Sequence, residues 1–228
     1  MVSLQRSLLR LHVEAVWGVQ LPPMLQDNVE LLSESSQPPW RLYAAEMDSD
    51  RVAIWRPDVS ATEREDLLVR VHEALALPPT MSTDPGISRE IALHQIALPT
   101  MSIAAAHMLA HPLTSHDQAL VEMFEPGSVE YYFHPDRRPL IGVIAEGHLL
   151  SLAHSSRRTA EACELGIDTL AEARRKGYAL AATVLWAASV AQEELVPLYS
   201  AFADNTASLR LAAAAGYRIF ARAATIAG

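Results

Sequence analysis

The residues best suited to chemistry lie between Cys163 and Ala179, where a predicted strand leads through a basic turn into a predicted helix. The first backbone N–H groups of a helix have no acceptor inside the helix, and the helix dipole favours negative charge there. Gly177 lets a ligand approach the backbone because it has no Cβ atom. The turn is therefore predicted to bind an anion, although a solvated turn before an ordinary helix would have the same composition. Three basic residues add positive charge to it: Arg174, Arg175 and Lys176.

The elements that must position this turn follow one another over residues 139–223. Alternation, turn residues and helical spacing predict the order strand, strand, strand, helix, strand, helix, strand. Gly216 is predicted to end the second helix. The predicted ranges are 139–145, 148–155, 159–169, 177–194, 195–201, 205–215 and 217–223.

The first half of the chain shows weaker patterns. Ser60 and Glu63 fit a capping box at the start of a helix that Pro78 and Pro79 end. Residues 27–39 are expected to be a loop, and residues 88–98 helical or mixed. The other predicted elements are a helix at 3–15, a hairpin from 41–45 and 51–55, and helices at 102–110 and 115–124.

Two spaced motifs in the second half resemble the signatures of the GNAT superfamily of acyl-CoA N-acyltransferases. The first is Arg174-x-x-Gly177-x-Ala179, preceded by Ala171 where the family usually has proline. The second comprises Asn205, Ser208, Leu211, Gly216 and Tyr217. The resemblance covers residues 120–228. It implies an α/β fold whose mixed central sheet is splayed at the cofactor strand, with residues 111–228 as the acyltransferase domain and residues 1–110 as an α/β extension.

The resemblance also implies a reaction. An acetyl or other short acyl group would pass from acyl-CoA to a primary amine by direct attack in a ternary complex. The pyrophosphate of the co-substrate, acetyl-CoA or another acyl-CoA, would lie at the helix start, and its pantetheine amides would pair with the preceding strand like an added strand. The expected binding residues are Ile167, Asp168, Thr169, Arg174, Arg175, Lys176, Gly177, Tyr178, Ala179 and Asn205.

The proton-handling residues depart from the family pattern, because Ala212 stands where many members place a tyrosine that protonates the leaving thiolate. Ser208 and Tyr199 are the candidate acids, and Ser208 could equally be a small residue for helix packing. Glu164 is the candidate base, or else a charge at a strand end. His148 and His154 could also serve, since histidine titrates near neutral pH. The loss of the usual acid keeps a second interpretation open, a CoA-binding sensor or interaction protein without transferase activity.

Composition limits the other possibilities. The chain has 228 residues and a formal net charge of −9, which argues against nucleic-acid binding and weakly favours a cationic acceptor. The lone Cys163 excludes an internal disulfide and is expected to be a packing residue. His107 and His111 lie four residues apart but lack a third ligand, so no metal site is predicted. Without a predicted membrane span or targeting signal, a cytoplasmic protein is expected, and a homodimer is possible.

Overall fold

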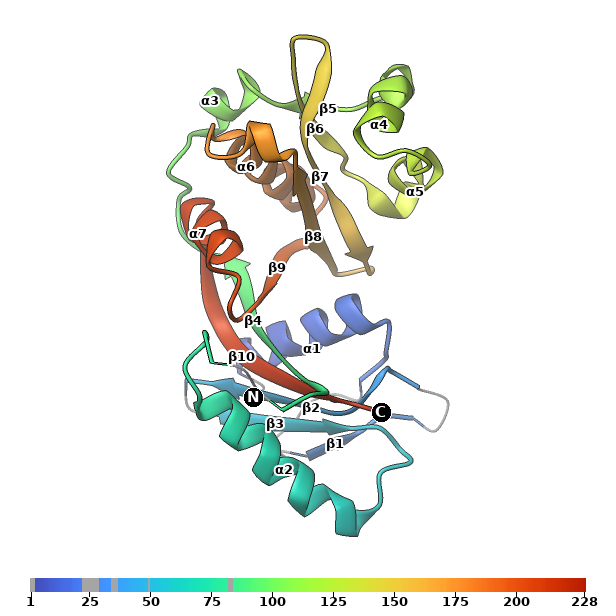
Figure 1. Cartoon of the computed structure of the whole chain (residues 1–228), viewed down its shortest axis with the longest axis vertical. Coiled ribbons are helices and arrows are strands. Elements are labelled where there is room, and N and C mark those ends of the chain that lie inside the picture. The colour runs from blue at the N-terminus through green and yellow to red at the C-terminus, as the bar shows by residue number, and fades with distance from the viewer. Residues whose placement is uncertain (1–2, 22–28, 34–36, 49, 82–83) are drawn as a thin grey trace. The chain divides into compact units, whose positions relative to one another are not determined.

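The computed structural model describes residues 3–21, 29–33, 37–48, 50–81 and 84–228. The chain forms two compact units (Figure 1). The first unit comprises residues 1–93, 200–209 and 219–228, and the second comprises residues 94–199 and 210–218. The units therefore interleave in sequence, and the expected boundary at residue 110 stays a prediction. None of the described helices combines the length and apolar character that crossing a membrane would need.

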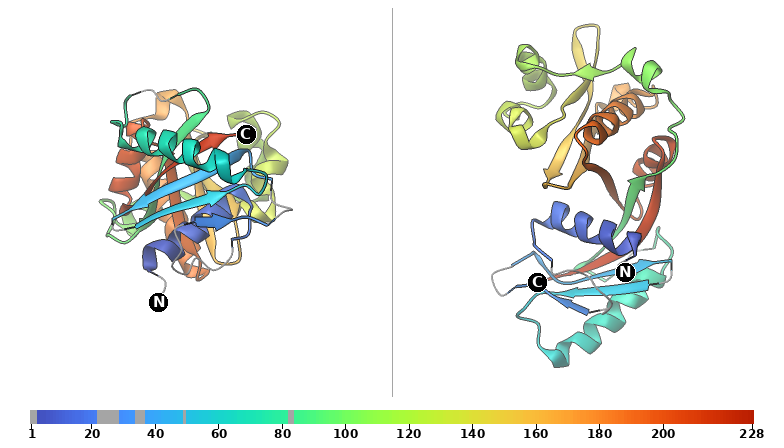
Figure 2. Two further views of the ribbon diagram at one scale, coloured as in Figure 1. Left: turned by 90° about the horizontal axis from the view of Figure 1, so that it is seen from below. Right: turned by 180° about the vertical axis from the view of Figure 1, so that it is seen from behind.

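The strands of the first unit neighbour one another in the order β1-β3-β2-β10-β4. Its strands are β1 (Val29–Leu31), β2 (Trp40–Met47), β3 (Asp50–Trp55), β4 (Ile87–Gln95) and β10 (Tyr217–Ala227). The predicted hairpin is confirmed: β2 and β3 are antiparallel, with Met47 opposite Asp50. The helices α1 (Leu4–Trp17) and α2 (Ala61–Ala76) lie on opposite faces of this sheet (Figures 1 and 2).

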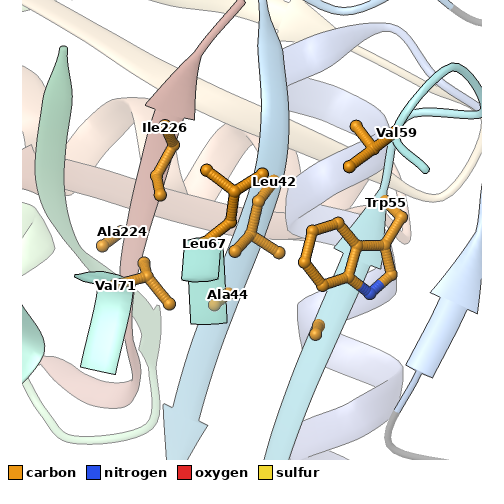
Figure 3. Close-up of a cluster of buried hydrophobic side chains, with 9 residues drawn as sticks. Leu42, Ala44, Trp55, Val59, Leu67, Val71, Ala224 and Ile226 are labelled. Carbon is orange, nitrogen blue, oxygen red and sulfur yellow. The ribbon is translucent and has the colours of Figure 1, made fainter. Parts of the chain in front are cut away.

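The core beneath α2 explains why that helix forms where the sequence predicts it. The Ser60–Glu63 capping box is present at its start. Leu67 and Val71 lie one turn apart on its inner face and pack against the sheet (Figure 3). The cluster comprises Leu42, Ala44, Ala53, Trp55, Val59, Leu67, Val71, Ala224 and Ile226.

Two expectations for the first half are wrong. Val29–Leu31 is a strand that pairs in parallel with β3, although residues 27–39 were expected to be a loop. Residues 87–95 form β4 and are not helical. Ile91, Ala92 and Leu93 are all buried, so this strand lacks the inside–outside alternation that marks a strand in a sequence. Pairing with neighbouring strands outweighs the local conformational propensity of these residues, so they form a strand.

In the second unit the strands neighbour one another in the order β9-β8-β7-β6-β5. These strands are β5 (His111–Pro112), β6 (Ile141–Ala145), β7 (His148–Arg158), β8 (Ala162–Thr169) and β9 (Val196–Phe202), of which residues 200–202 belong to the first unit. The helix α6 (Tyr178–Gln192) covers one face, while α4 (Gln118–Phe124) and α5 (Val129–Phe133) cover the other (Figures 1 and 2). β8 is antiparallel to β7 and parallel to β9, so the predicted mixed α/β class is confirmed.

The order of elements predicted over the second half is also confirmed, with small shifts at their ends. The hairpin β6–β7 turns at Glu146 and Gly147, which both have positive φ. The helix α7 spans Thr206–Ala214, and Gly216, with φ 89°, follows its end as predicted. The helix expected over 102–110 is shorter: α3 spans Ile103–His107, and the chain then forms β5.

Candidate functional site

The basic turn has the backbone geometry of an anion-binding helix start. Gly177 is the N-cap residue of α6, with φ 81°. The N–H of Ala181 donates to the carbonyl of Gly177 at 3.0 Å, so the preceding N–H groups of α6 have no acceptor within the helix. Gly177 has no side chain that could cap this end. Arg174, Arg175 and Lys176 are exposed beside it, and the turn can therefore receive an anion.

Two features of this turn were not predictable from its sequence. Arg175 also adopts positive φ, at 63°, which is uncommon for a residue with a side chain. Left-handed residues at Arg175 and Gly177 suit a turn in which successive N–H groups gather around one point. Met101 approaches the turn from a distant part of the chain, because a Cβ atom at residue 177 would lie 3.7 Å from its Cε.

Next to this turn, β8 has one edge that its neighbour only partly covers. The ladder between β8 and β9 runs from Ala162 opposite Val196 to Glu164 opposite Leu198. On the other edge the ladder with β7 continues to Thr169. Within the described part of the chain, residues 165–169 thus have a strand on one side only. Their backbone N–H and C=O groups need partners, and an extended ligand can supply them.

The register shows which side chains share a face of β8. Ser155 pairs with Leu165, and its Oγ accepts a hydrogen bond from Nε1 of Trp186 in α6 at 3.3 Å. Odd-numbered residues of β8 therefore face α6. His154 pairs with Gly166 on the opposite face, which α4 and α5 cover. Glu164, Gly166 and Asp168 consequently lie on the face toward α4 and α5.

His154 occupies the space that Gly166 leaves open. It is only 4% exposed, and a Cβ atom at residue 166 would lie 2.6 Å from its Nε2. Its Nε2 is 3.3 Å from the hydroxyl of Tyr131 in α5, and its ring meets that of Tyr132 edge-on, with centroids 5.0 Å apart. Burial, then the positive charges of Arg137 and Arg157, lower the pKa of His154 to about 4. The imidazole is therefore neutral at neutral pH.

Two carboxylates lie at the other end of this face. The hydroxyl of Tyr132 donates to Oε2 of Glu125 at 2.6 Å. Asp168 is exposed as a residue, but partial desolvation of its carboxylate, followed by the nearby charge of Glu125, raises its pKa. Burial, then the bond to Glu125 and the charge of Asp168, raise the pKa of Tyr132. Glu125, Tyr131 and Tyr132 were not predicted as site residues, because only tertiary contacts bring them to β8.

Glu164, the predicted base, lies inside the unit. It is 4% exposed, and its carboxylate oxygens are shielded from solvent. The predicted acid Tyr199 is also buried, and its ring meets that of Tyr217 with centroids 5.4 Å apart. Burial, followed by the charge of Glu164 and by Tyr199, raises the pKa of Tyr217 well above its ordinary value. Glu164 and the two tyrosines therefore form a buried group.

Asn205 and Ser208 belong to the first unit. Oδ1 of Asn205 accepts the N–H of Ser208 at 3.1 Å, which caps the start of α7. Ala212 is fully buried, so the position at which many GNAT members have a tyrosine is a small packing residue here. Their roles in catalysis or cofactor binding stay predictions.

Comparison with known proteins places these features in a family. The model of the GNAT acetyltransferase family matches residues 117–222. Residues 117–222 belong to the GNAT superfamily. The match includes β8, the turn before α6 and the Asn205–Tyr217 motif, as the sequence predicts. No curated protein matches the chain significantly.

Solved GNAT structures share the fold. A GCN5-related N-acetyltransferase from Kribbella flavida is 13% identical, with 100% of this chain and 97% of that chain covered and a TM-score of 0.52. An acetyltransferase from the GNAT family from Colwellia psychrerythraea is also 13% identical, with 82% of this chain and 65% of that chain covered and a TM-score of 0.54. At these identities the likeness concerns the fold alone.

Proposed function

We propose that this GNAT protein transfers an acetyl or other short acyl group from acyl-CoA to a primary amine. The observation that carries the proposal is the open edge of β8 leading to the uncapped start of α6. An extended chain with amides that ends in a pyrophosphate fits both parts: its amides complement residues 165–169, and its phosphates accept from the N–H groups near Gly177. Arg174, Arg175 and Lys176 add charge complementarity.

The reaction needs two proton movements. The neutral amine attacks the thioester carbonyl carbon, the new C–N bond forms, and the C–S bond breaks with its electron pair on sulfur. The proton that the amine loses must reach a base, and the thiolate must gain a proton. Glu164 is shielded, so we assign it a role through an intervening water molecule, and Tyr199 of the same unit supplies the proton to sulfur.

The burial of Glu164 and the replacement of the usual tyrosine by Ala212 also favour a second function. In this alternative the protein binds acyl-CoA as a sensor or interaction module and has no transferase activity. A thiol-release assay with acetyl-CoA and a panel of amines separates the two. Turnover of any amine supports transfer, and tight CoA binding without turnover of any amine class supports the sensor.

Both functions require the same CoA site, and two variants test it. Arg174→Glu reverses one charge at the turn, and Gly177→Asp places a negative side chain at a left-handed position beside the phosphates. We expect each to weaken CoA binding at least tenfold by calorimetry. Arg222→Glu, an exposed change in β10, is the matched control and should bind as the wild type does. Unchanged binding in both turn variants would rule out both functions.

A further inference from the structure

The second unit has a pocket beside β5, the last strand of its order. The pocket lies where β5 and β6 meet the segment around α4 and α5, and the end of α6 forms one wall (Figure 1). Its volume of about 580 Å³ is typical of small-molecule sites, which measure roughly 300–1,000 Å³. The strands β7 and β6 separate it from β8. Ser189 and Glu193 line it at the opposite end of α6 from Gly177, so the pocket is distinct from the proposed CoA site.

The floor of this pocket is apolar. Leu113, Tyr132 and Leu140 line it and belong to a hydrophobic cluster of the second unit. Phe133 lines it too and packs against the same cluster. These side chains offer hydrocarbon and aromatic surface to an occupant. An apolar body that lies on them removes that surface from water, which is favourable.

Arg138 supplies a positive charge in the wall. Its side chain is exposed and has no hydrogen-bond or ion-pair partner within the described ranges. Its backbone is held in place, because its carbonyl accepts from Oγ of Ser155 at 2.7 Å and from Nη1 of Arg158 at 3.1 Å. The pocket therefore carries a guanidinium on a fixed backbone, and the planar fork of N–H donors in that group matches a carboxylate.

The other charged residue that lines the pocket, Glu193, is already paired. Nη2 of Arg158 donates to Oε2 of Glu193 at 2.5 Å, while Nη1 of the same side chain donates to the carbonyl of Arg138. Arg158 thus joins the two charged parts of the wall and balances the charge of Glu193. The charge of Arg138 is left to attract an anion. Glu193 would repel a second negative charge in the same pocket, so a singly charged head group fits best.

We propose that this pocket binds a monocarboxylate with an apolar body. The carboxylate pairs with Arg138, and the hydrocarbon or aromatic part lies on Leu113, Phe133 and Leu140. Gln118, which also lines the pocket, can donate an amide N–H to the same carboxylate. The inference does not depend on the transferase function. Because this pocket and the turn before α6 are separate, the carboxylate and CoA can be bound at the same time.

The test uses three probes with the same phenylalkyl body: 4-phenylbutyrate, its neutral amide and the cationic 4-phenylbutylamine. Backbone amide shifts of residues 113–118 and 138–141 follow each titration of the full chain by NMR. We expect the carboxylate to bind about fivefold more tightly than the amide, as one exposed ion pair allows, and the amine to bind most weakly. Binding of the carboxylate should be unchanged in the presence of CoA.

Arg138→Gln should reduce the affinity for the carboxylate about fivefold and leave that for the amide unchanged. The variant keeps the wall intact, because the carbonyl of residue 138, and not its side chain, makes the printed bonds of the wall. Arg210→Gln, at an exposed arginine of the same unit, is the matched control and should bind all three probes as the wild type does.

Several results would overturn the inference while leaving the transferase function untouched. They are equal affinities for the carboxylate and the amide, tightest binding of the amine, and an unchanged affinity for the carboxylate in Arg138→Gln. Shift changes confined to other residues, or none with any probe, would also reject the site. Loss of carboxylate binding when CoA is added would show that the two sites are not separate.

Discussion

The imidazole of His154 lies against the backbone of Gly166, in the space where any other residue would carry its Cβ atom. The two residues are opposite each other in the antiparallel ladder of β7 and β8. Gly166 thus has a steric role, since it admits a buried ring to the face of β8 that α4 and α5 cover.

Gly166→Ala tests this relationship. The added methyl group overlaps the ring of His154, and we expect a loss of about 1–3 kcal/mol in the free energy of unfolding. In a His154→Ala background the same change should cost much less, because the space is empty. Urea denaturation of the two single variants and the double variant measures the coupling. Equal costs in both backgrounds would show that the ring does not require the glycine.

The low pKa of His154 makes stability depend on pH. The folded state holds the proton less tightly than the unfolded state, whose pKa is near 6.5. The contribution of neutral His154 to the free energy of unfolding is therefore fully present above that pH. It is lost as the pH falls toward about 4. The shift corresponds to roughly 3 kcal/mol at most. We expect His154→Phe to flatten the stability profile between these limits, and His148→Phe, at an exposed histidine of the same strand, to leave it unchanged.

The contribution of Asp168 to stability should depend on pH in the opposite direction to that of His154. Its pKa is raised by burial and then by Glu125, so the folded state holds the proton more tightly than the unfolded state does. Stability is greatest below the unfolded pKa and falls as the pH rises through the folded one. Asp168→Asn removes this loss, but Asp168 is exposed and water screens the effect, so we expect a melting temperature only slightly above that of the wild type at pH 7. A lower melting temperature at that pH, with Glu130→Gln unchanged, would contradict the sign.

The core of the first unit gives a further prediction. Leu67→Ala removes a buried side chain under α2 and should cost about 2–5 kcal/mol of unfolding free energy. Val69→Ala, on the exposed side of the same helix, should change it by less than about 0.5 kcal/mol. Chemical denaturation of both variants measures the difference. A small effect at Leu67 would mean that the sheet does not depend on this helix for its core.

The parts of the site that the sequence predicted are those with local causes. Gly177, three basic neighbours and the periodicity of α6 lie within one stretch, and so the strand, turn and helix could be predicted from it, while anion binding at the turn stays a prediction. The burial of Glu164 beside Tyr199 and Tyr217, and the approach of Glu125 and Tyr132 to Asp168, depend on distant segments. No pattern within any one of those segments encodes such contacts. β4 was missed for the same reason, since its consecutive residues Ile91, Ala92 and Leu93 are all buried by distant segments.

The three-residue ladder between β8 and β9 has a consequence for protein abundance. If the co-substrate completes the sheet as a temporary strand, it binds the folded chain and not the unfolded one, and its concentration adds directly to stability. At a hundredfold excess over Kd the gain is about 2.7 kcal/mol. Cells short of acyl-CoA would then hold less of this protein, because proteases remove the unfolded chain, and the amount of enzyme would follow the supply of its own acyl donor.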